Sequence, residues 1–178
     1  KVSLPAFTTA LEKVCVTLGR QIAQDGEGAT KLIEVRVRGA RSEDEADLVA
    51  KTVVASPLVK SAVYGEDPNW GRIIAAAGRS GAEFDPEQVS CWIAGGEIRA
   101  AVCEQGNLSE DLVSAKKALG SKEIRIELDL AAGNGQATAW GCDLTENMSR
   151  LTGSIPHETR RRPDGSPAIH AQVPWQDH

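Results

Sequence analysis

A strict alternation of apolar and charged residues most constrains how this chain can fold. In the stretch LIEVRVR (residues 32–38), isoleucine and valine alternate with glutamate and arginine. In a β-strand, successive side chains point to opposite faces. The alternation therefore predicts a strand with one buried and one solvated face. EIRIELDL (123–130) and QATAWGCDL (136–144) are expected to form a hairpin across Asn134-Gly135, a dipeptide typical of tight turns. Two further strands are expected on either side of the Gly95-Gly96 turn, at residues 89–93 and 97–102.

Helix signals precede and separate these strands. Ser3 followed by Pro5 marks a helix start, and this helix should end near Asp25-Gly26. Ser42 and Glu45 have the spacing of a capping box for a second helix, which should stop before Pro57. The first helix should present one apolar face, made of Phe7, Leu11, Cys15 or Val14, Leu18 and Ile22.

Two shorter helices complete the pattern. Asn69 can cap a helix through GRIIAAAGRSG (71–81), and Ser109 can begin one that ends near Gly120. The order of elements predicts an α+β fold, a layered sandwich of mostly antiparallel sheets covered by helices. We expect one domain over residues 1–147. Residues 148–178 differ in composition and are expected to form an atypical, disordered tail.

Composition narrows the class of protein. With 41% hydrophobic and 25% charged residues, the chain has the balance of a soluble globular domain. A formal net charge of −5 argues against nucleic-acid binding, and no apolar run approaches the length of a membrane span. The four cysteines form no C-x-x-C pair, which argues against a zinc site. We interpret them as buried free thiols in a reducing compartment and expect a cytoplasmic protein.

Histidine is absent from the first 147 residues, because His157, His170 and His178 all follow Met148. Chemistry in the domain must therefore proceed without a histidine base, which argues against Ser-His-Asp or Cys-His catalysis.

Two loops are candidates for a binding role. In QDGEGATKLIEV, Glu27 lies between two glycines at a helix-to-strand junction, where a carboxylate could meet the ammonium group of a substrate. The alternative is a helix-capping loop with a surface glutamate. In YGEDPNWGR, Asn69, Trp70 and Arg72 could form either a structural corner or the wall of a site.

Three stretches of the chain, taken in order, resemble the ornithine acetyltransferase family of arginine biosynthesis. They are DGEGATKLIEV, SPLVKSAVYGEDPNWGRIIAAAG and CDLT. The resemblance covers residues 1–147 and implies a bifunctional glutamate N-acetyltransferase that cleaves its own precursor. It implies that the N-terminal Thr of a second chain takes acetyl from N-acetylornithine and passes it to glutamate. It further implies that Glu27 contacts the amino-acid substrate.

The same resemblance implies partners. A first chain of the precursor would supply the oxyanion hole, and two copies of each chain would assemble. No bound cofactor or metal is expected, although acetyl-CoA could serve as a donor. A related self-processing amidase or aminopeptidase, and a non-catalytic amino-acid-binding module, remain alternatives.

Both ends of the chain depart from the family pattern. The expected nucleophile should precede Lys1, and Thr8 and Thr9 match no motif, so this chain is interpreted as a fragment that is inactive alone. After Asn147, permissible codons for residues 148–158, read with one restored base, give Tyr-Val-Pro-Val-Asn-Gly-Lys-Tyr-Thr-Thr and a stop. This resembles the family ending, so we hypothesise a one-base frameshift, real or from sequencing. The alternative is a natural basic extension containing Arg160-Arg161-Arg162.

Overall fold

The computed structural model of the protein describes residues 3–109, 111–146 and 148. The predictions for the tail, its histidines and its arginine run lie outside these residues. The helices are α1 (Leu4–Gln24), α2 (Glu43–Ala55), α3 (Pro57–Tyr64), α4 (Trp70–Gly78), α5 (Leu112–Leu119) and the short 3-10 helix η1 (Pro86–Gln88). The strands are β1 (Leu32–Ala40), β2 (Ser90–Gly95), β3 (Ile98–Glu104), β4 (Asn107–Leu108), β5 (Glu123–Asp129) and β6 (Gly135–Cys142).

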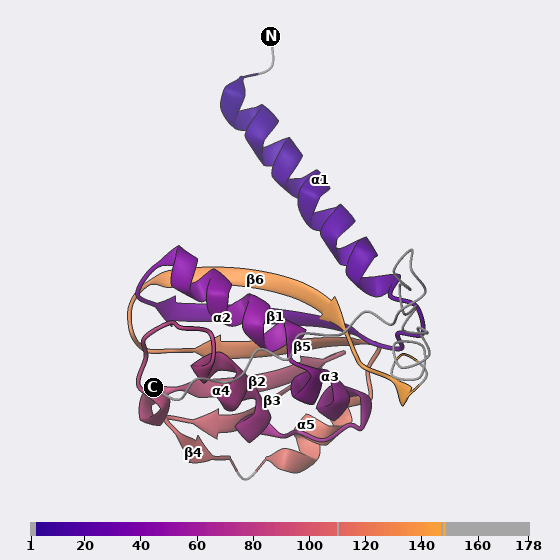
Figure 1. Cartoon of the computed structure of the whole chain (residues 1–178), viewed down its shortest axis with the longest axis vertical. Helices are drawn as coiled ribbons and strands as arrows, with labels where there is room; N and C mark the ends of the chain where they lie inside the picture. The colour runs from indigo at the N-terminus through magenta and orange to yellow at the C-terminus, as the bar shows by residue number, and fades with distance from the viewer. Residues whose placement is uncertain (1–2, 110, 147, 149–178) are drawn as a thin grey trace, which may run out of the picture.

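The strands form one six-stranded sheet in the order β4-β3-β2-β5-β1-β6 (Figure 1). The β1–β5 pair is parallel, whereas the other neighbours are antiparallel. The predicted β2–β3 hairpin is confirmed. The predicted hairpin between β5 and β6 is wrong, because β1 lies between them: Val35 pairs with Ile126 on one side and Ala139 on the other. Asn134 and Gly135 still reverse the chain, but the two strands that they connect lie on either side of β1.

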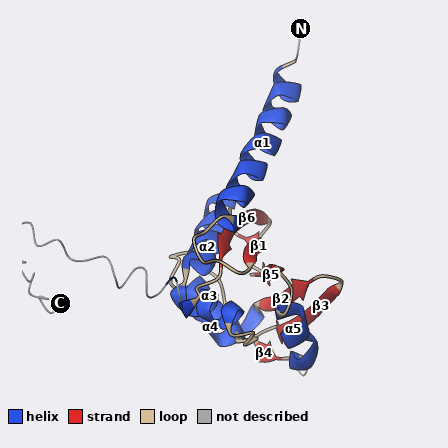
Figure 2. Cartoon of the chain, turned by 90° about the vertical axis from the view of Figure 1, so that its right-hand side faces the viewer, coloured by secondary structure: helices blue, strands red, loops and turns tan. Residues whose placement is uncertain are grey.

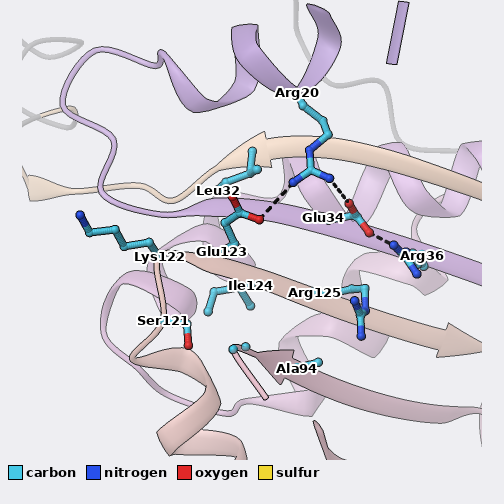
Figure 3. A pocket seen from close by; sticks show the side chains of 12 residues that line it. Arg20, Leu32, Glu34, Arg36, Ala94, Ser121, Lys122, Glu123, Ile124 and Arg125 are labelled. Carbon is cyan, nitrogen blue, oxygen red and sulfur yellow. Dashed lines mark hydrogen bonds and ion pairs between the residues drawn. The ribbon is translucent and has the colours of Figure 1, made fainter. Parts of the chain in front are cut away.

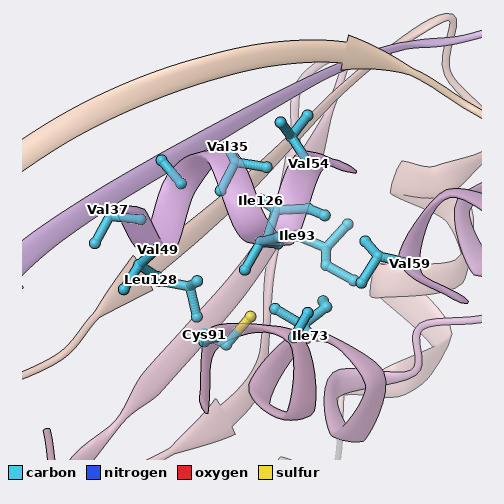
Figure 4. Close-up of a cluster of buried hydrophobic side chains, with 14 of the residues drawn as sticks. Val35, Val37, Val49, Val54, Val59, Ile73, Cys91, Ile93, Ile126 and Leu128 are labelled. Carbon is cyan, nitrogen blue, oxygen red and sulfur yellow. The ribbon is translucent and has the colours of Figure 1, made fainter. Parts of the chain in front are cut away.

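Helices α2 to α5 cover one face of this sheet, which confirms the α+β class. The alternate side chains of β1, β2 and β5 that point to this face are fully or almost fully buried. They pack with small side chains from the helices into a single cluster (Figure 4). Gly95 allows close contact, because an added Cβ would lie 2.1 Å from the carbonyl oxygen of Ala118 in α5. Core residues labelled in Figure 4 include Val35, Val37, Val49, Val54, Val59, Ile73, Cys91, Ile93, Ile126 and Leu128.

The opposite face of the sheet is polar, as the alternation in β1 predicted. Arginines and carboxylates from neighbouring strands pair there, for example Arg38 with Asp129 at 2.9 Å. The indole of Trp92 lies among them, with the guanidinium carbons of Arg99 and Arg38 at 4.6 and 5.5 Å from its ring centre. These cation–π contacts and ion pairs let charged side chains cover a solvated sheet face.

Most local signals at helix ends behave as expected. The Ser42 hydroxyl accepts a hydrogen bond from the Glu45 amide, and the side chain of Asn69 accepts one from the Arg72 amide. Pro57 does more than end α2, since it occupies the first turn of α3, a helix that the sequence analysis did not anticipate. The last helix is capped by Asp111, two residues after the predicted Ser109.

Helix α1 projects away from the sheet and its covering helices (Figures 1 and 2). Ser3 and Asp25 are its N-cap and C-cap, in agreement with the prediction, but none of its residues is buried. The apolar stripe is present and open to solvent: Phe7 is 57%, Leu11 50% and Ile22 77% exposed. Cys15 on this helix is exposed, so the expectation of buried thiols is wrong there and correct for Cys91, Cys103 and Cys142. All four are free.

Candidate functional site

The loop between α1 and β1 carries Glu27, the binding residue predicted from the sequence. Gly28 has a φ of +78°, a conformation that favours glycine, and the Ala29 amide donates to the Gly26 carbonyl at 2.9 Å. The Glu27 side chain is exposed. No hydrogen bond or ion pair engages it within the described part of the chain, so its carboxylate is open to a cationic group.

A buried carboxylate from the other end of the domain holds this loop. Asp143 is 0% exposed. Its Oδ1 accepts hydrogen bonds from the Thr30 amide at 2.8 Å and the Lys31 amide at 3.1 Å, and its Oδ2 accepts one from the Thr30 hydroxyl. The Asp143 amide donates in turn to the Lys31 carbonyl at 3.1 Å. A buried charge requires hydrogen-bond donors, and the donors to the Asp143 carboxylate described above all belong to Thr30 and Lys31 of the loop.

The residues around Asp143 contact the loop as well. The Thr145 hydroxyl donates to the Gly28 carbonyl at 3.0 Å. A Cβ added to Gly26 would lie 2.8 Å from the sulfur of Cys142, so the loop backbone passes close to this residue. Leu144 donates through its amide to the Lys60 carbonyl of α3 at 3.4 Å. The DGEGATK and CDLT stretches, far apart in sequence, therefore form one unit.

Lys31 connects this unit to two helix ends. Its side chain is 11% exposed, and its ammonium donates to the Leu119 carbonyl at 2.6 Å, the Glu66 carboxylate at 3.0 Å and the Val63 carbonyl at 3.4 Å. Val63 and Leu119 lie in the last turns of α3 and α5, where a positive charge is favourable. Glu66 has a φ of +54°. The roles of Lys31 and Glu66 could not be predicted from the sequence, because contacts between distant segments leave no spacing signal.

The Asp67–Arg72 corner is held by its own contacts. Asn69 donates through Nδ2 to Asp67 at 3.1 Å while capping α4, and Arg72 donates to the Leu58 carbonyl at 3.2 Å. Trp70 is partly buried against the core. Of the two interpretations left open, these contacts support a structural corner. Among the described residues, the YGEDPNWGR stretch reaches the Glu27 loop region through Glu66 rather than through Asn69 or Arg72.

A pocket of about 440 Å³ lies on the polar sheet face beside the end of α1 (Figure 3). Arg20 of α1 reaches into it, 3.1 Å from Glu123 and 3.5 Å from Glu34. Glu34 is nearly buried and also accepts hydrogen bonds from Arg36 and from the indole of Trp140. Because Arg20 pairs with both carboxylates that line the pocket, Glu34 and Glu123, it attaches α1 to the sheet and leaves no unpaired charge on Glu34.

Other sites are not evident in the described part of the chain. No group of three histidine, cysteine, aspartate or glutamate side chains is placed to hold a metal ion within residues 3–109, 111–146 and 148. None of the helices described is both long and apolar enough to cross a membrane.

Comparison with known proteins matches most of the chain. The model for the ArgJ family matches residues 1–154. A protein of Methanosarcina mazei named glutamate N-acetyltransferase is 51% identical over 150 residues, which cover 83% of this chain and 38% of that protein. One of Caldanaerobacter subterraneus, named arginine biosynthesis bifunctional protein ArgJ, is 50% identical over 149 residues, covering 83% of this chain and 37% of that protein.

A solved structure agrees with the fold. The crystal structure of the arginine biosynthesis bifunctional protein argJ from Bacillus halodurans has a TM-score of 0.76 and 46% sequence identity. The match covers 83% of this chain and 68% of that chain. The chain thus spans less than two fifths of the length of the curated relatives it matches.

Proposed function

The chain belongs to the ArgJ family, and from this we propose that it forms the amino-acid-binding part of a glutamate N-acetyltransferase that also uses N-acetylornithine. The observation that carries this proposal is the loop of Glu27, which presents an exposed, unpaired carboxylate from a backbone fixed by Asp143. N-acetylornithine carries a side-chain ammonium group, remote from the acetyl group that is transferred, and such a carboxylate can bind it.

The proposed chemistry is a two-step acyl transfer. A Thr hydroxyl supplied by the rest of the enzyme attacks the acetyl carbonyl of N-acetylornithine, which forms an acetyl ester and releases ornithine with the proton on its amine. The amine of glutamate then attacks the ester, so N-acetylglutamate leaves and the hydroxyl is restored. The α-amino group of that Thr serves as base, and a first chain supplies the oxyanion hole.

In this scheme Glu27 binds substrate and does not take part in bond making. The described residues contain no histidine, which is consistent with a base supplied from elsewhere. We further propose self-cleavage of a longer precursor, two copies of each chain in the assembled enzyme, a cytoplasmic location and acetyl-CoA as an additional donor.

The test is a chimera in which residues 3–146 replace the matching segment of the Methanosarcina mazei relative. We expect this chimera to convert N-acetylornithine and glutamate to ornithine and N-acetylglutamate, whereas the 178-residue chain alone shows no turnover. Glu27→Gln in the chimera should raise the KM for N-acetylornithine about tenfold, as expected when a charged hydrogen bond to substrate is lost. Glu97→Gln, an exposed glutamate in the β2–β3 turn, is the matched control and should change nothing.

A chimera that folds and is processed but transfers no acetyl group would contradict the proposal. Turnover by the isolated chain would contradict its assignment as a partial enzyme.

A further inference from the structure

We propose that Asp143 is a positioning residue for substrate binding, which acts by fixing the loop of Glu27 through Thr30 and Lys31. This inference rests on the proposed function of Glu27 and deepens it. Asp143 contacts no part of the loop's solvent-exposed carboxylate directly; its three acceptor bonds go to the backbone and hydroxyl that follow Glu27 in the chain.

The loop cannot fix Glu27 by itself. Glu27 stands between Gly26 and Gly28, and glycine is the residue with the widest choice of backbone conformation. Exposed on a backbone of this kind, a glutamate side chain would occupy many positions. Ordering it on binding would weaken the affinity for substrate, so a constraint from outside the loop is needed for efficient binding.

The constraint on the loop comes from residues 142–145, which contact it on both sides of Glu27. Before Glu27, Gly26 lies against Cys142; after it, Gly28 accepts from the Thr145 hydroxyl. Asp143 then fastens residues 30 and 31, where β1 begins. These contacts fix the backbone on both sides of Glu27 and leave its side chain in solvent.

The carboxylate of Asp143 is suited to this role by its charge. It is fully buried, and burying a charge is costly unless hydrogen bonds compensate. Its compensation comes from two backbone amides and one hydroxyl, all in the loop, while Lys31 turns its ammonium away to the ends of α3 and α5. The buried charge therefore acts on loop geometry, since a neutral side chain would satisfy these donors less completely.

The experiment uses Thr30, an exposed residue whose hydroxyl donates to Asp143. Thr30→Val removes the hydroxyl that donates to Asp143 and keeps the side-chain shape, whereas Thr30→Ser keeps the hydroxyl. In the 178-residue chain, Thr30→Val should speed hydrogen exchange of the amides of residues 26–31, with protection of β1 and β5 unchanged. Thr30→Ser should exchange like the unmodified chain.

In the chimera described above, Thr30→Val should raise the KM for N-acetylornithine roughly five- to tenfold, the effect of losing one hydrogen bond. We expect kcat to stay within about twofold, because the loop binds substrate without touching the reacting atoms. Asp143→Asn keeps one acceptor oxygen and should give a similar or larger rise in KM. Thr30→Ser should restore the original KM.

The outcomes separate this inference from the proposed function. If the unmodified chimera is inactive, the proposed function fails. If it is active and Glu27→Gln raises KM but Thr30→Val and Asp143→Asn do not, the positioning role is overturned. The role is equally overturned if both variants lower kcat and thermal stability together and leave KM unchanged.

Discussion

Replacing Lys31 by methionine tests the connection between the site and the helix ends. Methionine keeps most of the length and apolar volume of the lysine stem, so packing is preserved and the ammonium alone is lost. That ammonium donates to the carbonyls of Leu119 and Val63 and pairs with Glu66. Val63 retains the Glu66 amide as a donor, whereas the Leu119 carbonyl has no other donor within the described residues.

The magnitude follows from these contacts. The short bond to Leu119 is a charged hydrogen bond, worth about 2 kcal/mol. The favourable position at two helix C-termini adds about 0.5 kcal/mol each. The ion pair with Glu66, whose side chain is 44% exposed, adds no more than about 0.5 kcal/mol. We therefore expect Lys31→Met to lower the free energy of unfolding by about 3 kcal/mol and Tm by roughly 6–12 °C for a domain of this size.

Circular dichroism at 222 nm against temperature, together with urea titration, measures this change. Lys51→Met is the control, because Lys51 is exposed and, among the described residues, pairs only with Asp47 one turn away on the surface of α2. It should lower Tm by no more than about 2 °C. If Lys31→Met unfolds at the same temperature as Lys51→Met, the ammonium does not stabilise these helix ends and the reasoning is refuted.

Three further predictions concern the sheet, the first helix and the end of the chain. Burial raises the pKa of Glu127, but the hydrogen bonds and charges of Arg99 and Arg125 outweigh it and hold this pKa below its usual range. A lowered pKa stabilises the fold above the pKa of an unfolded glutamate, about 4.3, and the contribution is lost as pH falls through the folded value. The urea midpoint of Glu127→Gln should therefore be lower than that of the unmodified chain at pH 7 and fall less between pH 5 and 3; parallel curves would count against it. The exposed stripe of α1 should make the isolated chain self-associate as concentration rises, which light scattering after gel filtration can measure. Leu11→Glu should reduce the association and Thr9→Glu, on the opposite face, should not; equal effects would exclude the stripe as its cause. Sequencing the gene at the codon for Asn147 should find codons after it that encode the alternative ending in the shifted frame, and incompatible codons would end the frameshift hypothesis.

Local structure could be predicted from the sequence because its causes are local. Ser42 and Asn69 cap helices through bonds to amides three residues away, and the alternation in β1 separates a core face from a solvated one. Pro57 shows the limit of such signals. A proline ends one helix and equally begins the next, and only packing of α3 against the core decides between these outcomes.

Pairing between distant segments could not be predicted in the same way. The turn at Asn134-Gly135 is real, but nothing near it indicates that β1 inserts between β5 and β6. Glu27 was found through its glycine-flanked loop, and its role stays a prediction. Asp143 belonged to the CDLT stretch, yet its partners are more than a hundred residues away in sequence, so its function became visible only in three dimensions.

The place of β1 in the sheet has a consequence for how the polypeptide is made. On a ribosome β1 emerges before both strands that flank it in the sheet, which lie beyond residue 120. The β2–β3 hairpin can close as soon as it emerges, but β1 must wait until β5 and β6 are synthesised. Such long-range pairing is slow, and apolar segments stay exposed meanwhile. This chain should therefore depend on chaperones during synthesis, and premature termination before residue 120 should yield a polypeptide that cannot complete its sheet.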